Sequence, residues 1–444
     1  MSTVPARRGV VLDAAAMRRV EARRRRRRAQ VRRRRVVLLA VLGLLAFVGN
    51  AVLGGGGAGT PRAAADRSAL PAPRLTSFVA ARQRVPGRRP PAPWPETGQG
   101  AIAVVGSGIV ARSPHEREVP IASVTKMMTA LVILADHPLA LGERGPALRM
   151  TRDDAALWVA DSQVGDSTLP VRAGEVLSEY QLLEGLLIPS GDNVATMLAR
   201  WDAGGQQRFV ERMNLEARVL GLDHTHYADA SGVSPGSRST ASDQAVLATV
   251  LMADPVVRRI VALQHVPFPV AGTIWNYNPA LGADGIVGVK SGFTSSAAAC
   301  LVTAAYRDVG GRSVLVVVAT LGQPGGLAGA ATADERLLAS ATGALVRVRL
   351  ESPRGAVATA HVAWSTEDVP LAAPELPATL VSWASTVIDV TMVPTAPGPA
   401  PIGARGVSLG TLVLHSSGGL VLRSPLVAAR AIPPVPAGWT AGSG

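Results

Sequence analysis

The sequence predicts an α/β (α+β) protein in which helices cover an antiparallel sheet and a small C-terminal β-sandwich follows. Three observations predict this class. Residues 99–349 begin with a pair of strand-like segments, continue with several helical segments and end with three strand-like segments. Residues 350–444 are rich in valine, alanine, proline and glycine and show few helical patterns. Of the 444 residues, 48% are apolar, which is enough for a sizeable core.

The predicted elements start at residue 101. Residues 101–111 contain two apolar runs around a Gly-Ser-Gly turn, the pattern of a strand pair. Four helical segments follow, at residues 123–135, residues 176–188, residues 206–222 and residues 241–252. Pro189 ends the second segment. The third has apolar residues at helical spacing, and Thr240 with Asp243 resembles an N-terminal cap for the fourth.

The apolar pattern then changes to that of strands. Three strand-like segments joined by tight turns lie at residues 285–293, residues 299–307 and residues 313–322. Near the C-terminus, the turn sequence Ser416–Gly419 separates two more β-rich runs. Residues 350–444 are therefore expected to form the β-sandwich domain.

The N-terminus has the pattern of a membrane anchor. Residues 1–35 contain 14 arginines and two acidic residues, so the other 409 residues carry a net charge of only +1. Residues 36–53 carry no charge and are long enough to span a bilayer as a helix. We therefore expect an Arg-rich cytoplasmic tail, a single transmembrane signal anchor and an extracytoplasmic remainder in the cell membrane. A cleaved signal peptide and a nucleic-acid-binding arm are the alternatives.

Residues 54–98 have the composition of a linker. They begin with Gly54–Gly57 and contain eight prolines, which favour extended, poorly packed chain. Such a segment would hold a folded unit away from the membrane.

The first of three short motifs is Ser123-Val-Thr-Lys126. A serine and a lysine three residues apart lie on the same face of a helix. Among apolar neighbours such as Met127, the lysine is expected to lose its proton easily and to accept that of the serine. The alternative is a capping serine beside a lysine that extends to solvent.

The second motif is Ser190-Gly191-Asp192, which follows Pro189 and precedes Asn193. The proline places the serine on a loop between two helices, where its hydroxyl can relay a proton. Alternatively, Ser190 or Asp192 caps the next helix.

The third motif is Lys290-Ser291-Gly292, at the end of a predicted strand. A lysine and a hydroxyl at a strand edge can bind a carboxylate. The glycine allows the backbone of a ligand to approach and to pair as an added strand. The alternative is an exposed lysine before a hairpin turn.

In this order and spacing, the three motifs resemble those of penicillin-binding serine enzymes. The stretches IASVTKMMTALVIL, LLEGLLIPSGDNVATMLA and GVKSGFTSSAAACLV resemble D-alanyl-D-alanine carboxypeptidases of the low-molecular-mass penicillin-binding protein class, peptidase family S11. The resemblance covers residues 99–349. It implies a serine D,D-peptidase domain with the penicillin-binding/serine β-lactamase-like transpeptidase fold, and it extends less specifically to the β-rich C-terminal domain.

The resemblance also implies roles for single residues. Ser123 would be the nucleophile that forms the acyl-enzyme, Lys126 the general base and Ser190 the proton relay. Lys290 and Ser291 would bind the terminal carboxylate of the substrate.

Two further substrate contacts are implied around the third motif. Gly292 completes the motif. The backbone N–H groups of Ser123 and Phe293 would form the oxyanion hole.

The sequence departs from the family pattern at Asp192, where asparagine is usual. An amide can donate a hydrogen bond to a substrate carbonyl, whereas an ionised carboxylate cannot. Either Asp192 accepts a hydrogen bond from Lys126, or Asn193 reaches into the site instead. Both residues are therefore candidate substrate-binding residues.

The expected function is removal of the terminal D-alanine from peptidoglycan stem peptides ending in D-Ala-D-Ala, with β-lactams as covalent inhibitors. A D,D-endopeptidase acting on peptidoglycan cross-links and a non-catalytic envelope protein with the same fold are the alternatives. The resemblance implies no cofactor. Neither metal nor nucleic acid is expected: His224 and His226 lack a supporting HExxH motif, and the basic charge is confined to the tail.

Overall fold

The computed structural model describes residues 70–88, 91–105, 109–349, 355–376, 379–395, 405–416, 421–436 and 439. The predicted cytoplasmic tail (1–35) and transmembrane anchor (36–53) lie outside these residues. In the part of the chain that is described, no helix is both long enough and apolar enough to cross a bilayer.

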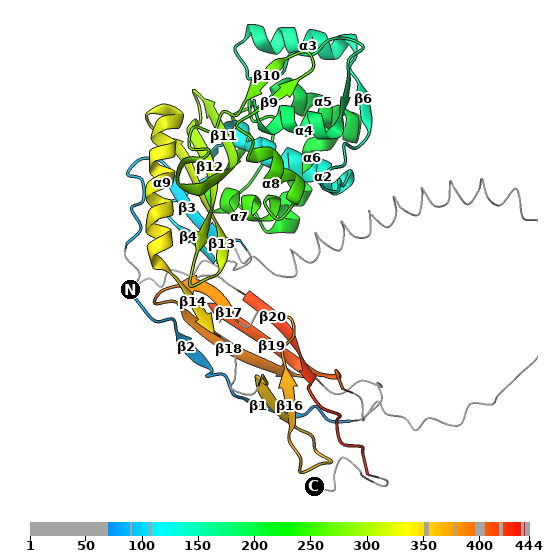
Figure 1. Cartoon of the computed structure of the whole chain (residues 1–444), viewed down its shortest axis with the longest axis vertical. Coiled ribbons are helices and arrows are strands. Elements are labelled where there is room, and N and C mark those ends of the chain that lie inside the picture. Colours follow the sequence, from blue (N-terminus) through cyan, green and yellow to red (C-terminus); the bar gives the residue numbers. More distant parts are fainter. Residues whose placement is uncertain are drawn as a thin grey trace, which may run out of the picture.

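A five-stranded antiparallel sheet lies at the centre of residues 99–344, which we call the central domain (Figure 1). Its strand order is β11-β12-β13-β3-β4. The strands are β3 (Gln99–Val104), β4 (Ile109–Arg112), β11 (Ile286–Thr294), β12 (Ala298–Asp308) and β13 (Ser313–Gln323). The predicted strand pair and the three later strands thus form one sheet, and β11 is an edge strand.

Alternate residues of these strands pack on opposite faces of the sheet. On one face, Ile102 and Val318 pack against α9 (Gly326–Ala344). On the other, Ala103 and Val317 belong to the larger core shared with the other helices. Figure 1 shows α9 on one side of the sheet and the remaining helices on the other.

A buried carboxylate fastens α9 to the sheet. Asp334 on α9 accepts hydrogen bonds from the hydroxyl groups of Thr303 on β12, at 2.9 Å, and Thr320 on β13, at 2.7 Å. Burial raises the pKa of Asp334 well above its usual value, while the two hydroxyl groups act in the opposite direction.

The helical side of the central domain contains the helices that the sequence predicted, together with others that it did not. They are η1 (Ala122–Thr125), α2 (Lys126–Asp136), α3 (Arg152–Gln163), α4 (Glu179–Leu187), α5 (Asp192–Ala203), α6 (Gln206–Leu220), α7 (Ala241–Leu251), α8 (Pro255–Val261) and η2 (Ala283–Gly285). Thr240 caps α7 by accepting a hydrogen bond from the backbone N–H of Asp243. The helix expected from Ser123 begins with the 3₁₀ turn η1, which contains Ser123, and continues as α2 from Lys126.

Three pairs of short strands complete the central domain. They are β5 (Val119–Pro120) with β8 (Arg238–Ser239), β6 (Ala147–Arg149) with β7 (Val176–Ser178), and β9 (His265–Phe268) with β10 (Gly272–Trp275).

The C-terminal strands form a seven-stranded sheet of order β1-β15-β16-β20-β19-β18-β2 and the separate pair β14-β17. They are β14 (Leu345–Arg349), β15 (Ala358–His361), β16 (Val369–Ala372), β17 (Thr379–Trp383), β18 (Val387–Pro394), β19 (Ser408–Ser416) and β20 (Val421–Ala428). Val348 and Leu380 of the pair share an apolar cluster with the larger sheet. The β-sandwich expected for residues 350–444 stays a prediction.

Two strands of this sheet come from the segment expected to be a linker. β1 (Arg74–Ser77) pairs with β15, and β2 (Arg82–Arg84) pairs with β18. The prediction of a linker over residues 54–98 therefore does not hold for residues 74–84. These strands are short and lie at the two edges of the sheet, where little apolar surface is needed, so no hydrophobic pattern revealed them.

Candidate active site

Lys126 lies at the centre of the candidate site. Its side chain is fully buried, and its Nζ donates three hydrogen bonds. The acceptors are Ser123 Oγ at 2.7 Å, Asp192 Oδ1 at 2.5 Å and the backbone oxygen of Ser231 at 2.9 Å. A lysine ammonium has three N–H donors, and these three acceptors use all of them.

The structure decides between the two interpretations of the second motif. Asp192, the first residue of α5, forms a buried ion pair with Lys126. Asn193 points elsewhere: its side-chain amide donates to the backbone oxygen of Leu169 and accepts from the N–H of Leu169, at 2.8 and 3.0 Å. The expectation that Asn193 contacts substrate was therefore wrong, because both of its polar atoms are already paired with backbone.

Asn193 and Asp192 together fasten the loop after α3 to this motif. The backbone N–H of Asp192 donates to the backbone oxygen of Ser167 at 2.7 Å. This contact places Asp166 near the ion pair. Burial raises the pKa of Asp166, the charge of Asp192 raises it further, and the charge of Lys126 lowers it. The sequence analysis did not single out Asp166.

Ser190 lies on the turn between α4 and α5, as predicted. Its backbone is left-handed, with φ of 63°, which is unusual for a residue other than glycine. Its hydroxyl is buried and has no hydrogen-bond partner among the described residues. An unpaired buried hydroxyl costs free energy, so this group is available to a ligand or a reacting atom.

The third motif lies directly against the first. A Cβ atom added to Gly292 on β11 would lie 2.8 Å from the backbone nitrogen of Ser123 and 3.0 Å from that of Val124. Glycine was expected to let a ligand approach, and the structure shows that it lets β11 approach η1. The backbone nitrogen of Ser123, a predicted oxyanion-hole donor, is thus held beside β11.

Lys290 is the second buried lysine of the site. It lies two residues before Gly292 on β11 and therefore on the same face of the strand. Burial, followed by the charge of Lys126, lowers the pKa of Lys290 well below its usual value, whereas the charge of Asp192 raises it. Its Nζ donates to the backbone oxygen of Ser291 at 2.8 Å, which leaves donors for a ligand.

Ser291 and Phe293 occupy the opposite face of β11. Ser291 is buried, whereas the side chain of Phe293 is 59% exposed. Because β11 is an edge strand, an extended peptide can add to the sheet beside Ser123.

One loop of the site was missed in the sequence. Ser231 accepts from Lys126, and Gly232, with φ of 90°, passes so close to Ala122 that a Cβ atom would lie 1.8 Å from the Ala122 oxygen. Asp229 shapes the loop, since its carboxylate accepts from the N–H of Gly232 at 2.9 Å and from Ser237 Oγ at 2.5 Å. The only signal was the Asp-Ala-Ser-Gly sequence, which is typical of many turns.

The arrangement has the elements of a nucleophilic serine site. A partly exposed hydroxyl lies 2.7 Å from a lysine nitrogen, and backbone N–H groups lie beside it on a tight turn. A second cation and an open strand edge flank the serine. These features suit attack on the carbonyl of a peptide that carries a carboxylate.

Comparison with known proteins agrees with this chemistry. The family model of D-alanyl-D-alanine carboxypeptidase, peptidase S11, matches residues 102–321. Over 206 residues the chain is 34% identical to D-alanyl-D-alanine carboxypeptidase DacB2 of Mycobacterium tuberculosis, covering 45% of this chain and 66% of that protein. Over 213 residues it is 32% identical to D-alanyl-D-alanine carboxypeptidase of Streptomyces sp. strain K15, covering 44% of this chain and 70% of that protein.

The chain belongs to peptidase family S11. Among solved structures, penicillin binding protein 6B from Escherichia coli has a TM-score of 0.55 at 22% identity, covering 78% of this chain and 99% of that one. This similarity confirms the predicted penicillin-binding fold. The chain spans between about half and two thirds of the length of the curated relatives it first matches.

The contact between Gly292 and η1 gives a test of the S11 site. We expect Gly292→Ala to slow labelling of Ser123 by a fluorescent penicillin by about tenfold or more, because the added methyl group displaces η1 from β11. Gly343→Ala is the matched control, since a Cβ atom there meets nothing within 4 Å. The control should label like the wild type, and equal labelling of both variants would contradict the proposed role of the contact.

Proposed function

We propose that this protein is a serine-type D-Ala-D-Ala carboxypeptidase that removes the terminal D-alanine from peptidoglycan stem peptides through an acyl-enzyme on Ser123. The observation that carries the proposal is the 2.7 Å contact between Lys126 Nζ and Ser123 Oγ, in a site that also holds Asp192 and Lys290. Membership of family S11 supports it.

The first step depends on which groups of the site carry protons. As an ammonium, Lys126 cannot accept a proton, so one of its three protons leaves before the reaction. The Asp192 carboxylate, 2.5 Å away, is the nearest acceptor. The neutral amine then takes the hydroxyl proton of Ser123 while Oγ bonds to the carbonyl carbon of the substrate.

The tetrahedral intermediate next expels the amine of D-alanine. The backbone N–H groups of Ser123 and Phe293 would stabilise the oxyanion. We assign the proton relay to Ser190, whose buried hydroxyl has no other partner in the described chain. It would give its proton to the departing nitrogen and receive in return the proton that Lys126 took from Ser123. Water then hydrolyses the ester and releases the shortened peptide.

Substrate orientation follows from charge and from the strand edge. Lys290 is the cation that would bind the terminal carboxylate, together with Ser291. The stem peptide would lie along β11 as an added strand. A β-lactam, which carries a carboxylate beside a reactive amide, would bind in the same way and acylate Ser123.

The nucleophile is tested by Ser123→Ala. We expect the variant to fold, because a methyl group fits where the hydroxyl was, and to form no covalent adduct with penicillin and release no D-alanine. Lys126→Ala should also prevent acylation, because no other base lies within hydrogen-bonding distance of Ser123 Oγ among the described residues. Intact mass after incubation with penicillin is the measurement. An adduct on Ser123→Ala, or none on folded wild type, would refute the assignment.

A D,D-endopeptidase is the second candidate, because some similar relatives carry the name D-alanyl-D-alanine endopeptidase. The same residues would cut the cross-link between two stem peptides. Incubation with a pentapeptide and with a cross-linked muropeptide separates the two activities: a carboxypeptidase releases D-alanine from the first faster than it cleaves the second.

The ion pair of Asp192 predicts an altered pH profile. In Asp192→Asn the buried ion pair with Lys126 is lost, and so is the charge that raises the pKa of Lys290. The pKa of Lys290, which burial and the charge of Lys126 already lower, should then fall further, so Lys290 loses its proton at lower pH and the basic limb of the acylation profile should move to lower pH. We expect the maximal acylation rate to stay within about tenfold of the wild type.

Asn193→Ala is the neighbouring control for this experiment. It leaves the buried N–H and oxygen of Leu169 without partners, so it should lower the free energy of unfolding by about 1–3 kcal/mol. Its acylation profile should keep the wild-type shape. A shifted profile in Asn193→Ala, or none in Asp192→Asn, would count against the pairing.

We further propose that residues 36–53 anchor the protein in the cell membrane, with the catalytic domain outside the cytoplasm. The basis is the sequence alone: the arginine-rich segment, the uncharged run and a substrate class found in the cell envelope. A C-terminal fusion to a reporter that works only in the cytoplasm should be inactive, whereas an extracytoplasmic reporter should be active. The reverse result would overturn this topology.

A further inference from the structure

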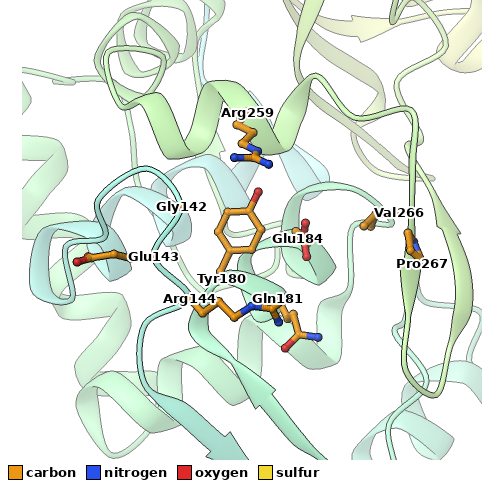
Figure 2. Close-up of a pocket in the computed structure, with 9 residues that line it drawn as sticks. All are labelled: Gly142, Glu143, Arg144, Tyr180, Gln181, Glu184, Arg259, Val266 and Pro267. Carbon is orange, nitrogen blue, oxygen red and sulfur yellow. The ribbon is translucent and has the colours of Figure 1, made fainter.

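A cavity of about 310 Å³ lies between α4, α8, β9 and the loop that precedes β6 (Figure 2). Nine residues line it: Gly142, Glu143, Arg144, Tyr180, Gln181, Glu184, Arg259, Val266 and Pro267. None of them belongs to the site around Lys126, and the chemistry of that site does not use them.

The loop wall of the cavity is held in place by hydrogen bonds. The backbone N–H of Tyr180, on the first turn of α4, donates to the backbone oxygen of Arg144 at 3.0 Å. The carboxylate of Glu143 accepts from the backbone N–H of Ala140 at 2.8 Å, which holds this side chain against its own loop. The cavity is therefore pre-formed.

Arg144 and Arg259 are exposed at the cavity, and among the described residues their guanidinium groups form neither an ion pair nor a hydrogen bond, although the charges of both act on Glu184. Figure 2 shows the hydroxyl group of Tyr180 directed toward Arg259, with Arg144 on the opposite side of the ring. Guanidinium groups bind carboxylate and phosphate-like anions through paired N–H donors.

Glu184 is the buried acid of the cavity. It is 6% exposed, and its carboxyl group has no hydrogen-bond partner in the part of the chain that is described. Burial raises the pKa of Glu184 to about 7, although the charges of Arg144 and Arg259 lower it. Below pH 7 the group is mostly a neutral acid that can donate a hydrogen bond, and above pH 7 it is an anion.

We propose that this cavity binds a small anion, a carboxylate or a phosphate-like group, between Arg144 and Arg259 and beside the carboxyl group of Glu184. With Glu184 neutral, the two guanidinium groups outnumber the one remaining acid of the lining, Glu143, which favours an anion over a cation. The volume is at the lower end of that of ligand pockets, which fits a compact ligand. The site is independent of the acylation of Ser123.

Calorimetric titration of the full-length protein in detergent tests the site, with acetate and sulfate as probes because both keep a constant charge from pH 6 to pH 8. We expect saturable binding of at least one probe at pH 6. Preference for acetate identifies a carboxylate ligand, and preference for sulfate identifies a phosphate-like one. No saturable binding of either probe would overturn the proposal.

Variants locate the binding. Arg144→Ala and Arg259→Ala should each raise the dissociation constant by about tenfold or more. Arg218→Ala removes an equally exposed arginine from α6, outside the cavity, and should leave it unchanged. An equal loss of affinity in all three variants would show that the anion is attracted by the net charge of the protein and not by this cavity, and it would overturn the proposal.

The pH dependence tests Glu184. Between pH 6 and pH 8 its neutral fraction falls about tenfold, so anion binding by the wild type should weaken by about the same factor. Glu184→Gln keeps a hydrogen-bond donor without the titration, so its binding should persist and vary little over this range. Wild-type binding that does not change with pH, or a variant with the same pH dependence, would overturn the role of Glu184.

Discussion

The buried ammonium of Lys126 is the interaction on which the rest of the site depends. Removing a charge from water costs several kcal/mol unless hydrogen bonds and an opposite charge replace the water. Here the replacement comes from three separate parts of the chain: η1, the start of α5 and the loop at Ser231, the last two lying 66 and 105 residues from Lys126 in sequence. The charge therefore fixes the relative positions of these segments as well as serving the chemistry.

The site also has to balance the charges of two buried lysines. Lys126 and Lys290 are both buried and close enough to influence each other, and Asp192 is the carboxylate that forms an ion pair with one of them. An asparagine at this position would leave two neighbouring cations with less compensation. The acidic residue therefore offsets part of the positive charge of the site.

Much of this could be predicted from the sequence, because the relevant signals are local. A serine and a lysine three residues apart, a proline before Ser190 and an alternating apolar pattern around Lys290 each depend on neighbouring residues. What could not be predicted depends on contacts between distant segments. The partner of Asn193 is a backbone group 24 residues away, and the space for a side chain at Gly232 is taken by Ala122, which lies far from it in the sequence. The helix α9 was missed because its alanine-rich sequence has no strong apolar period.

The strands β1 and β2 are synthesised long before the strands with which they pair in the C-terminal sheet. They leave the ribosome before the central domain, whereas their partners β15 and β18 leave after it. The contact between Ser385, which precedes β18, and Gly87 shows the same separation: the hydroxyl of Ser385 donates to a backbone oxygen 298 residues earlier in the sequence. At about 5–20 residues per second, these segments wait for roughly tens of seconds without a partner. Exposed arginines at Arg74, Arg82 and Arg84 put positive charge on both segments, which discourages pairing with the wrong strand during that interval.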